Sequence, residues 1–222
     1  ALELTLETLE TPPETLLDVG AGTGAATLAA QQLLDLKSAV CLERAAVMRD
    51  LGQKLVAADW RAFDIAADDL PETADLVVAS YMLNEVADPI FAARKLWNAA
   101  ESVLLIVESA LPESVALLQK IRTDLTERGA HVAAPCPHDK PCAEWCHFAC
   151  RIERSRLHKQ LKGGDAPFED EKFSFIALTK APALRRSARV LRHPQIGTNK
   201  VGLTLCTPDG IIEKTVFKPD KA

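Results

Sequence analysis

The sequence lacks any long apolar run, and this absence excludes one class of protein. Across 222 residues no apolar stretch approaches the roughly 20 residues that a bilayer-spanning helix needs. Residues 1–14 have neither the basic start nor the apolar stretch of a secretory signal peptide. Internal repeats and low-complexity tracts are also missing. We therefore expect one globular domain with a smaller appendage, a monomer with no membrane association.

Charge is unevenly spread along a chain of ordinary composition. Hydrophobic residues make up 48% and charged residues 26% of the chain. The part before Lys140 contains 10 Lys and Arg and 22 Asp and Glu, whereas the part from Lys140 onward contains 16 Lys and Arg and 9 Asp and Glu. This asymmetry indicates an acidic, catalytic-type domain followed by a basic segment that binds phosphates. A basic face that only meets solvent is the alternative.

Short apolar stretches without polar alternation follow one another, separated by helical patterns. Strands that are apolar throughout predict a parallel sheet covered on both faces. The fold class is thus α/β, with a parallel sheet and helices on both of its faces. The expected strands are 15–19, 38–43, 75–80 and 102–108, and the expected helices are 25–34, 45–55, 89–100 and 112–128.

The remainder of the chain changes character. A segment rich in proline and cysteine covers 134–146, helical spacing continues from 147 to about 161, and 173–178 reads as a returning strand. Three β-like stretches, 187–192, 201–206 and 211–217, predict a β-rich appendage. We divide the chain into a Rossmann core (1–133), a segment with the cysteines, a basic helix and the returning strand (134–180), and the C-terminal appendage (181–222).

A glycine-rich loop follows the first expected strand and opens the first expected helix. Glycines there let the backbone turn tightly and approach a ligand closely. Dinucleotide-binding loops carry Gly-x-Gly-x-x-Gly, whereas this loop has Gly-x-Gly-x-Gly after an aspartate, the pattern of Rossmann methyltransferases. The loop therefore predicts a Rossmann-like S-adenosylmethionine (SAM) methyltransferase fold, with a SAM site that contains Asp18, Gly20, Gly22 and Gly24.

Two further residues complete the predicted cofactor site. Glu43 ends the second expected strand, where a carboxylate accepts hydrogen bonds from both ribose hydroxyls. Ser80 ends the third. Asp59 and Asp64 are candidates for the adenine side.

No catalytic residue is predicted. The residues after Ser80 lack the Asn/Asp-Pro-Pro-Tyr/Phe motif of amino-group methyltransferases of nucleic acids, and no cysteine follows a proline as in cytosine-C5 enzymes. Tyr81, Asn84 and Glu85 either line the pocket or belong to a packed helix.

Four of the six cysteines lie between residues 136 and 150. A local cluster without a signal peptide indicates metal or iron–sulfur binding rather than disulfides. Cys136, Cys142 and Cys146 supply three thiols, and spacing alone leaves Cys150 and Cys206 open as the fourth. His138 and His147 are natural zinc ligands in isolation, but four thiols make them dispensable.

A basic run follows the cluster on the helix expected there. It forms a phosphate-binding face or a solvated helix surface. Its predicted RNA-binding members are Arg151, Arg154, Arg156, Lys159 and Lys162, with His158 among them.

An ordered series of motifs resembles the Rsm22 family, the methyltransferase-like proteins of the mitochondrial small ribosomal subunit and their bacterial relatives. The resemblance runs from about Leu16 to Gly210. Its motifs are Ala134-Pro135-Cys136-Pro137-His138, Trp145-Cys146-His147-Phe148, Arg154-Ser155, Leu161-Lys162-Gly163-Gly164 and residues 168–174.

The resemblance implies a four-cysteine 4Fe–4S cluster and association with the small ribosomal subunit or its rRNA during assembly. Cys136, Cys142, Cys146 and Cys206 match the four cluster positions, which makes Cys150 a spare thiol, expected as a small buried residue on a helix. The cluster's expected role is structural, because it closes a long loop.

Two alternatives to a methyltransferase-like assembly protein remain. One is a catalytically active small-subunit rRNA methyltransferase, and the other is a zinc-stabilised RNA-binding module without cofactor. The expected compartment is the bacterial cytoplasm, with the mitochondrial matrix as the alternative.

Overall fold

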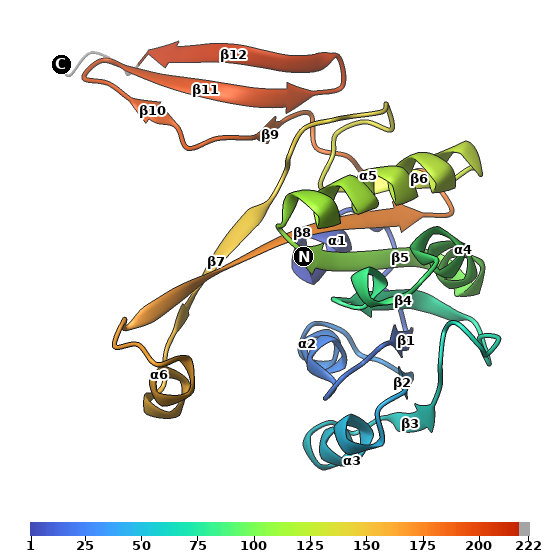
Figure 1. The fold of residues 1–222 in the computed structure, drawn as a ribbon. Coiled ribbons are helices and arrows are strands. Elements are labelled where there is room, and N and C mark those ends of the chain that lie inside the picture. The colour runs from blue at the N-terminus through green and yellow to red at the C-terminus, as the bar shows by residue number, and fades with distance from the viewer. Residues whose placement is uncertain (218–222) are drawn as a thin grey trace.

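A twisted sheet of eight strands forms the centre of the molecule, and a separate sheet of four strands lies beyond one end of it (Figure 1). The computed structural model describes residues 1–217. The large sheet has the order β3-β2-β1-β4-β5-β8-β6, and β7 pairs with an extension of β8. Among the described residues no helix combines the length and apolarity that crossing a membrane requires.

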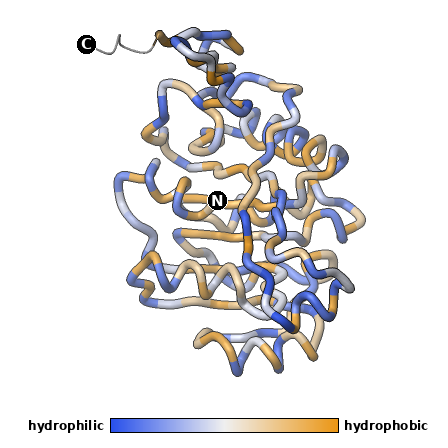
Figure 2. The backbone as a smooth tube through the Cα atoms, turned by 90° about the vertical axis from the view of Figure 1, so that its left-hand side faces the viewer, coloured by the Kyte–Doolittle hydropathy of each residue, from blue (hydrophilic) through white to orange (hydrophobic). Residues whose placement is uncertain are grey.

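Five parallel strands make up the first part of the sheet. Alternate residues of β1 point to opposite faces: Leu16 packs on the face with α1 and α2, and Leu17 on the face with α4 and α5. Both faces are buried, which explains why these strands are apolar throughout and why hydrophobic colour runs along the central strands in Figure 2. The strands are β1 (Thr15–Val19), β2 (Ser38–Glu43), β3 (Asp59–Ala62), β4 (Ala74–Ser80) and β5 (Ala100–Ser109).

Most helices of the core alternate with the strands along the chain. Those predicted from the sequence form with shifts of one residue at their ends, and a short N-terminal helix and a 3-10 turn add to them. The elements are α1 (Leu2–Leu6), α2 (Ala25–Leu33), α3 (Ala46–Leu55), the 3-10 helix η1 (Leu83–Glu85), α4 (Pro89–Ala99) and α5 (Pro112–Glu127).

The last strand of the core reverses direction. β8 (Phe168–Thr179) runs antiparallel between β5 and β6 (His131–Ala134). Its C-terminal half, from Ser174 to Thr179, is buried, whereas its N-terminal half is largely exposed. The strand predicted at 173–178 thus belongs to the core sheet and begins earlier than its apolar residues indicate.

The helix predicted at 147–161 is wrong in its first half. Residues Phe148–Glu153 form β7, which pairs antiparallel with Phe168–Phe173 of β8. Phe148 stacks on Phe173 with ring centroids 5.5 Å apart, so strand pairing with an aromatic contact replaces the helix. The helix α6 begins only at Arg156, after Ser155 has accepted a hydrogen bond from the His158 N–H as N-cap.

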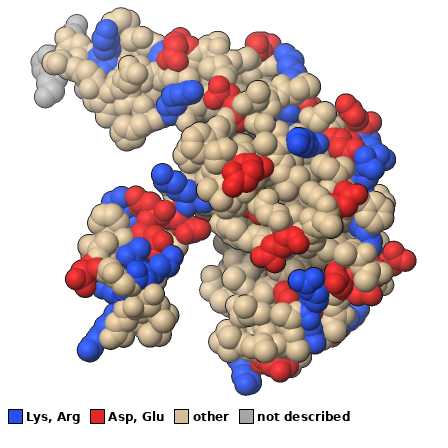
Figure 3. All heavy atoms as spheres, viewed as in Figure 1, with Lys and Arg blue, Asp and Glu red and all other residues tan. Residues whose placement is uncertain are grey.

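The paired extension of β7 and β8, together with α6 (Arg156–Lys162), projects away from the body of the protein (Figure 1). We call residues 148–173 the arm. Figure 3 shows it as a lobe set apart from the core, with acidic and basic side chains intermixed.

The C-terminal appendage is the β-rich unit that the sequence predicts. Its two long strands, joined at the turn before Gly210, form a hairpin with eight paired positions between Lys200 and Phe217. Two short strands flank the hairpin through β11. The strands are β9 (Arg189–Val190), β10 (Gln195–Ile196), β11 (Lys200–Thr207) and β12 (Gly210–Phe217).

Candidate functional site

A cleft of about 480 Å³ opens at the carboxyl ends of β1, β2 and β4. This edge of a parallel sheet is where open α/β folds bind ligands, and the volume is typical of a small-molecule site. Five of the six residues predicted for the cofactor line it: Asp18, Gly20, Gly22, Glu43 and Ser80.

Asp18 is buried at the bottom of the cleft with one oxygen unsatisfied. Its Oδ2 accepts hydrogen bonds from the Thr27 N–H at 3.1 Å and the Thr27 hydroxyl at 2.7 Å, while Oδ1 has no partner. Burial raises the pKa of Asp18 from 3.8 to about 6, against the lowering effect of the Thr27 hydrogen bonds. A buried acceptor without a donor is costly, so this oxygen marks a place for a ligand's donor.

The three glycines of the loop have different roles. Gly20 and Gly22 have φ of +70° and +56° and face the cleft, and a Cβ on Gly20 would lie 2.8 Å from the Met82 Cβ. Gly24 departs from its prediction, because it is absent from the cleft lining. It caps α2 with φ of +89°, and a Cβ there would lie 2.9 Å from Val56 Cγ2. Close packing against α3, rather than ligand contact, requires glycine at this position.

Glu43 connects the glycine loop to the second strand. Its Oε2 accepts from the Gly22 N–H at 2.9 Å and its Oε1 from the Ala45 N–H at 2.7 Å, so the carboxylate faces the cleft in a fixed orientation. Of the two adenine-side candidates, Asp64 lines the cleft. Asp59 instead binds Arg61 at 2.9 Å outside it.

The segment after β4 forms the remaining wall, and Glu108 braces it. Glu108 is 1% exposed, and its two oxygens accept from the Leu83 N–H at 2.8 Å and the Asn84 side chain at 2.6 Å. Burial raises its pKa. Sequence reasoning missed Glu108, whose only signal is an acid at the end of an apolar strand. Asn84 is exposed, but its side-chain amide is directed to Glu108 rather than into the cleft.

Tyr81 stands at the mouth of the cleft in an unusual backbone conformation. It is the one non-glycine residue with positive φ (56°) in the described chain, and its side chain is 43% exposed. Such strain is concentrated at functional sites. Tyr81 and Glu85 both line the cleft.

The structure brings the predicted metal-binding cysteines to one region. Cys136, Cys142 and Cys146 line a small cavity of about 50 Å³ between α5 and β8. Cys206 approaches from β11, and its thiol interacts electrostatically with Cys142 and Cys146. All six cysteines are free, and in the described chain no three His, Cys, Asp or Glu side chains are close enough together to hold a metal ion.

Cys150 does not share this region. It lies exposed on β7, opposite Glu171 of β8, and not buried on a helix as expected. The helical turn that would bring Cys150 next to Cys146 is absent, because residues 148–153 are extended.

The electrostatics of three of these thiols, Cys136, Cys146 and Cys206, favour the neutral form. Burial raises the pKa of Cys136 to about 11 and also raises those of Cys146 and Cys206. Arg122 and Arg189 oppose this effect through their positive charges. Both guanidinium groups hold a buried nitrogen without a partner, Nε of Arg122 and Nη1 of Arg189.

Three hydrogen bonds anchor the segment that carries Cys142 and Cys146 to the core. The Trp145 indole donates to the Ala110 carbonyl at 2.9 Å, Gln119 donates to the Glu144 carbonyl at 2.7 Å, and the Ser174 hydroxyl donates to the Cys146 carbonyl at 2.7 Å. The segment has no regular secondary structure, so these contacts determine where its thiols lie.

The basic run lies on the arm, where acids of β8 bind much of it. Arg151 forms two hydrogen bonds with Asp170, at 2.7 and 2.8 Å. Glu169 binds Arg154, His158 and Lys162 at 3.0, 3.1 and 3.2 Å. Arg156 and Lys159 lie on α6 with His158 and Lys162, whereas Arg151 lies on β7 and Arg154 between the two elements. The run is therefore partly neutralised within the arm.

Solved structures of methyltransferases resemble this chain in fold. The plantazolicin methyltransferase BpumL in complex with SAH has a TM-score of 0.53 at 14% identity over 80% of each chain. PH1948 from Pyrococcus horikoshii, a candidate RNA methyltransferase, has a TM-score of 0.52 at 18% identity, over 81% of this chain and 78% of that one. The chain therefore has the Rossmann-like methyltransferase fold.

Sequence comparison identifies the family. The human ribosome assembly protein METTL17, mitochondrial, is 28% identical over 235 residues. The match covers 92% of this chain and 50% of that protein, so the chain spans about half the length of the curated relative. The family model described as mitochondrial small ribosomal subunit Rsm22 matches residues 3–221, and the chain therefore belongs to the Rsm22 family.

Proposed function

We propose that this chain is a SAM-binding, methyltransferase-like protein that carries a 4Fe–4S cluster and binds the small ribosomal subunit or its rRNA during assembly. The observation that carries the proposal is the cleft, in which Asp18, Gly20, Gly22, Glu43 and Ser80 converge around an unsatisfied carboxylate oxygen. SAM supplies an electrophilic methyl group on a positively charged sulfur.

The residues of the cleft fit such a ligand. The free oxygen of Asp18 accepts a hydrogen bond from a cationic amine, which removes the cost of its burial. The glycine backbone allows close approach, and the Glu43 carboxylate offers its remaining lone pairs to adjacent hydroxyls. Phe63 and Ile65 supply apolar wall for an adenine ring.

The cysteine set fits an iron–sulfur cluster in its chemistry. Cys136, Cys142, Cys146 and Cys206 are free thiols around a shared region, and the buried Arg122 and the partly buried Arg189, each with one unpartnered nitrogen, stand beside them. A cluster held by four thiolates is anionic, so adjacent guanidinium groups lower its energy. Binding replaces the thiol protons, and the cluster joins the core to the appendage.

Family membership and the human relative support the ribosomal partner. That relative is named a mitochondrial ribosome assembly protein, which favours a mitochondrial setting over the bacterial cytoplasm expected from the sequence. The arm offers Arg151, Arg154, Arg156, Lys159 and Lys162 as the phosphate-binding set. Cosedimentation with isolated small subunits, compared with large subunits, tests this part.

Calorimetric titration with SAM tests the cleft. We expect saturable binding by the wild type and a loss of roughly 10-fold or more in affinity for Glu43→Ala, because two oriented hydrogen-bond acceptors disappear. Asp59→Ala is the matched control: it removes an acid whose partner is Arg61, outside the cleft. Equal affinity of Glu43→Ala and wild type contradicts the assignment. Transfer of labelled methyl groups to isolated small subunits would identify an active rRNA methyltransferase.

Visible absorbance and metal analysis after anaerobic purification test the cluster. We expect Cys206→Ser to lose the iron–sulfur band, because it removes one of four ligands, and Cys150→Ser to keep it, because Cys150 lies on the arm. An unchanged spectrum for Cys206→Ser rejects that ligand. Zinc at one equivalent without a visible band supports the zinc-stabilised alternative instead.

A further inference from the structure

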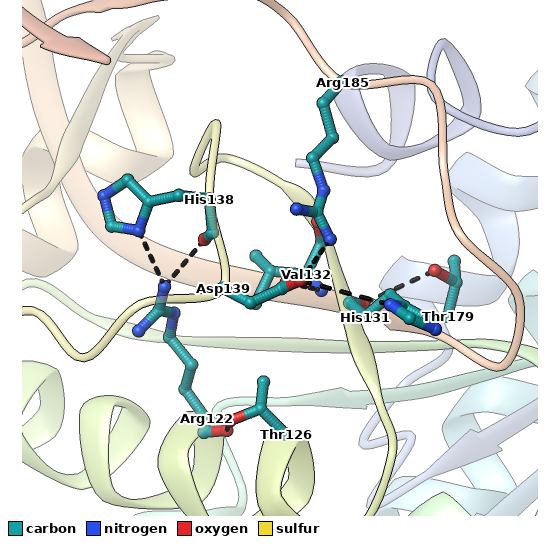
Figure 4. Close-up of polar contacts among 8 residues, drawn as sticks. All are labelled: Arg122, Thr126, His131, Val132, His138, Asp139, Thr179 and Arg185. Atoms are coloured by element: carbon teal, nitrogen blue, oxygen red, sulfur yellow. Dashed lines mark hydrogen bonds and ion pairs between the residues drawn. The ribbon is translucent and has the colours of Figure 1, made fainter. Parts of the chain in front are cut away.

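Arg122 reaches the cysteine region from the buried face of α5. Its side chain is 4% exposed, and its Nη2 lies 2.7 Å from the His138 carbonyl oxygen and 3.3 Å from His138 Nδ1 (Figure 4). A guanidinium group can only donate hydrogen bonds. His138 Nδ1 therefore accepts from Arg122 and carries no proton.

This contact determines which ring nitrogen of His138 carries the proton. His138 is 9% exposed, and its Nδ1 is occupied by the Arg122 donor. A neutral imidazole without a proton on Nδ1 carries it on Nε2. His138 Nε2 lies 3.5 Å from the Sγ atom of Cys206. Its N–H thus lies within reach of one of the four proposed ligands, and the Lys140 backbone is a further hydrogen-bond partner of the imidazole.

Hydrogen bonds from β6 and from Arg185 also fix the loop that carries His138. The next residue, Asp139, accepts hydrogen bonds from the Val132 N–H of β6 at 2.7 Å and from Arg185 at 2.6 Å (Figure 4). Arg185 belongs to the chain that leaves β8 for the appendage and also donates to the Val132 carbonyl at 3.0 Å. The imidazole is therefore fixed between the core and the strand that carries Cys206.

We propose that Arg122 and His138 are positioning residues of the thiolate centre: Arg122 selects the Nε2–H tautomer, and His138 donates an N–H···S hydrogen bond to Cys206. The proposal rests on the proposed function, since it assumes that Cys206 is a ligand. A donor to a ligand sulfur stabilises the thiolate, and partners of this kind are worth 10–100-fold in metal affinity. Hydrogen bonds to the sulfurs also set the reduction potential of a cluster.

The experiment compares three substitutions in the full chain after anaerobic reconstitution. His138→Leu removes the donor, His138→Gln places an amide N–H near the same position, and His147→Leu is the matched control, since His147 contacts Trp145 rather than a thiol. Two quantities are measured: the rate at which a chelator bleaches the cluster, and the reduction potential by spectroelectrochemical titration.

We expect His138→Leu to bleach roughly 10-fold faster than wild type and to have a more negative potential. His138→Gln should recover most of both, and His147→Leu should match wild type. Thermal unfolding of the apo forms separates these effects from misfolding. A fourth variant, Arg122→Met, removes both the donor to His138 Nδ1 and a buried positive charge beside the thiols, so we expect its potential to be at least as negative as that of His138→Leu.

Three outcomes would reject the proposal. A wild type that loads no cluster rejects the proposed metal centre and this proposal with it. A wild type that loads, with His138→Leu equal to His147→Leu in rate and potential, rejects the hydrogen bond alone. Equal losses in His138→Leu and His138→Gln also reject it, because a donor at Nε2 then has no effect.

Discussion

Three buried side-chain atoms in the described chain have no hydrogen-bond partner: Asp18 Oδ1, Arg122 Nε and Arg189 Nη1. One lies in the cleft, and two stand beside the cysteines. Buried polar groups are otherwise satisfied, because each unpaired group costs about 1–3 kcal/mol. The unpaired atoms are thus confined to the two places where we propose ligands, and their signs are complementary: an acceptor for a cationic cofactor and donors for an anionic cluster.

Asp18→Asn should weaken SAM binding and stabilise the folded protein at neutral pH relative to wild type. The pKa of Asp18 is raised to about 6 by burial, so the folded protein binds a proton more tightly than the unfolded chain, and its stability falls as pH rises from about 4 to about 6. The neutral amide lacks this dependence. We expect the variant's stability relative to wild type to increase by roughly 2 kcal/mol between pH 4 and pH 7.

Urea unfolding at the two pH values, without SAM, measures this effect. SAM affinity should fall in the same variant. Stability curves for wild type and Asp18→Asn that run parallel across this pH range would show that the carboxylate titrates normally.

Position along a strand was enough to identify much of the cleft from sequence. Asp18, Glu43 and Ser80 end parallel strands, and such ends meet at one edge of the sheet. Gly24, Glu108 and Arg122 were beyond this reasoning. Gly24 packs against α3, Glu108 binds the segment after β4, and Arg122 binds His138. These contacts join segments far apart in the sequence, so a local pattern does not reveal them.

At the scale of elements, the core was predictable and the arm was not. Each core strand and helix has one dominant sequence pattern, whereas residues 148–153 are compatible with a helical pattern and become a strand through pairing with β8. β3 and β6 have four residues each, too few for a periodic signal. The cysteine cluster was evident as a motif, but not the side from which Cys206 enters.

The charge pairs of the arm give a test of RNA binding. Glu169→Gln should tighten binding to small-subunit rRNA and steepen its salt dependence, because Arg154, His158 and Lys162 lose the carboxylate that occupies them. Fluorescence anisotropy at several salt concentrations measures both. Glu153→Gln, on the same arm, is the charge-matched control. Binding of the Glu169 variant no tighter than that of the control would contradict a masked phosphate-binding face.

At the scale of the molecule, the chain is a core, an arm and an appendage that meet near the cysteines. The arm continues the core sheet through β8, so backbone hydrogen bonds connect the two. The appendage has its own sheet, and polar contacts such as Arg185 with Asp139 and Arg186 with Glu7 connect it to the rest. The exposed pair of Arg186 with Glu7 contributes little, whereas the pair of Arg185 with Asp139 is partly buried. The proposed cluster would add a further connection.

Limited proteolysis tests this arrangement. We expect the metal-loaded wild type to resist cleavage between residues 180 and 200, and chelation or Cys206→Ser to speed cleavage there by roughly 10-fold or more, because apo protein loses the ligand's contribution to the folded state. Cys150→Ser should follow wild type. Equal cleavage rates with and without metal would mean that the appendage is held by its polar contacts alone.

The placement of β8 has a consequence for the order of folding. β6 pairs with β8 and with no other strand of the described sheet, so residues 131–134 remain unpaired until residues 177–179 have been synthesised and have inserted beside β5. Cys136 follows β6 by two residues. During translation the first thiol of the proposed centre therefore reaches its final position only after the core sheet is closed, and the last thiol, Cys206, arrives later still. Metal uptake would then occur only in a chain whose core has already folded.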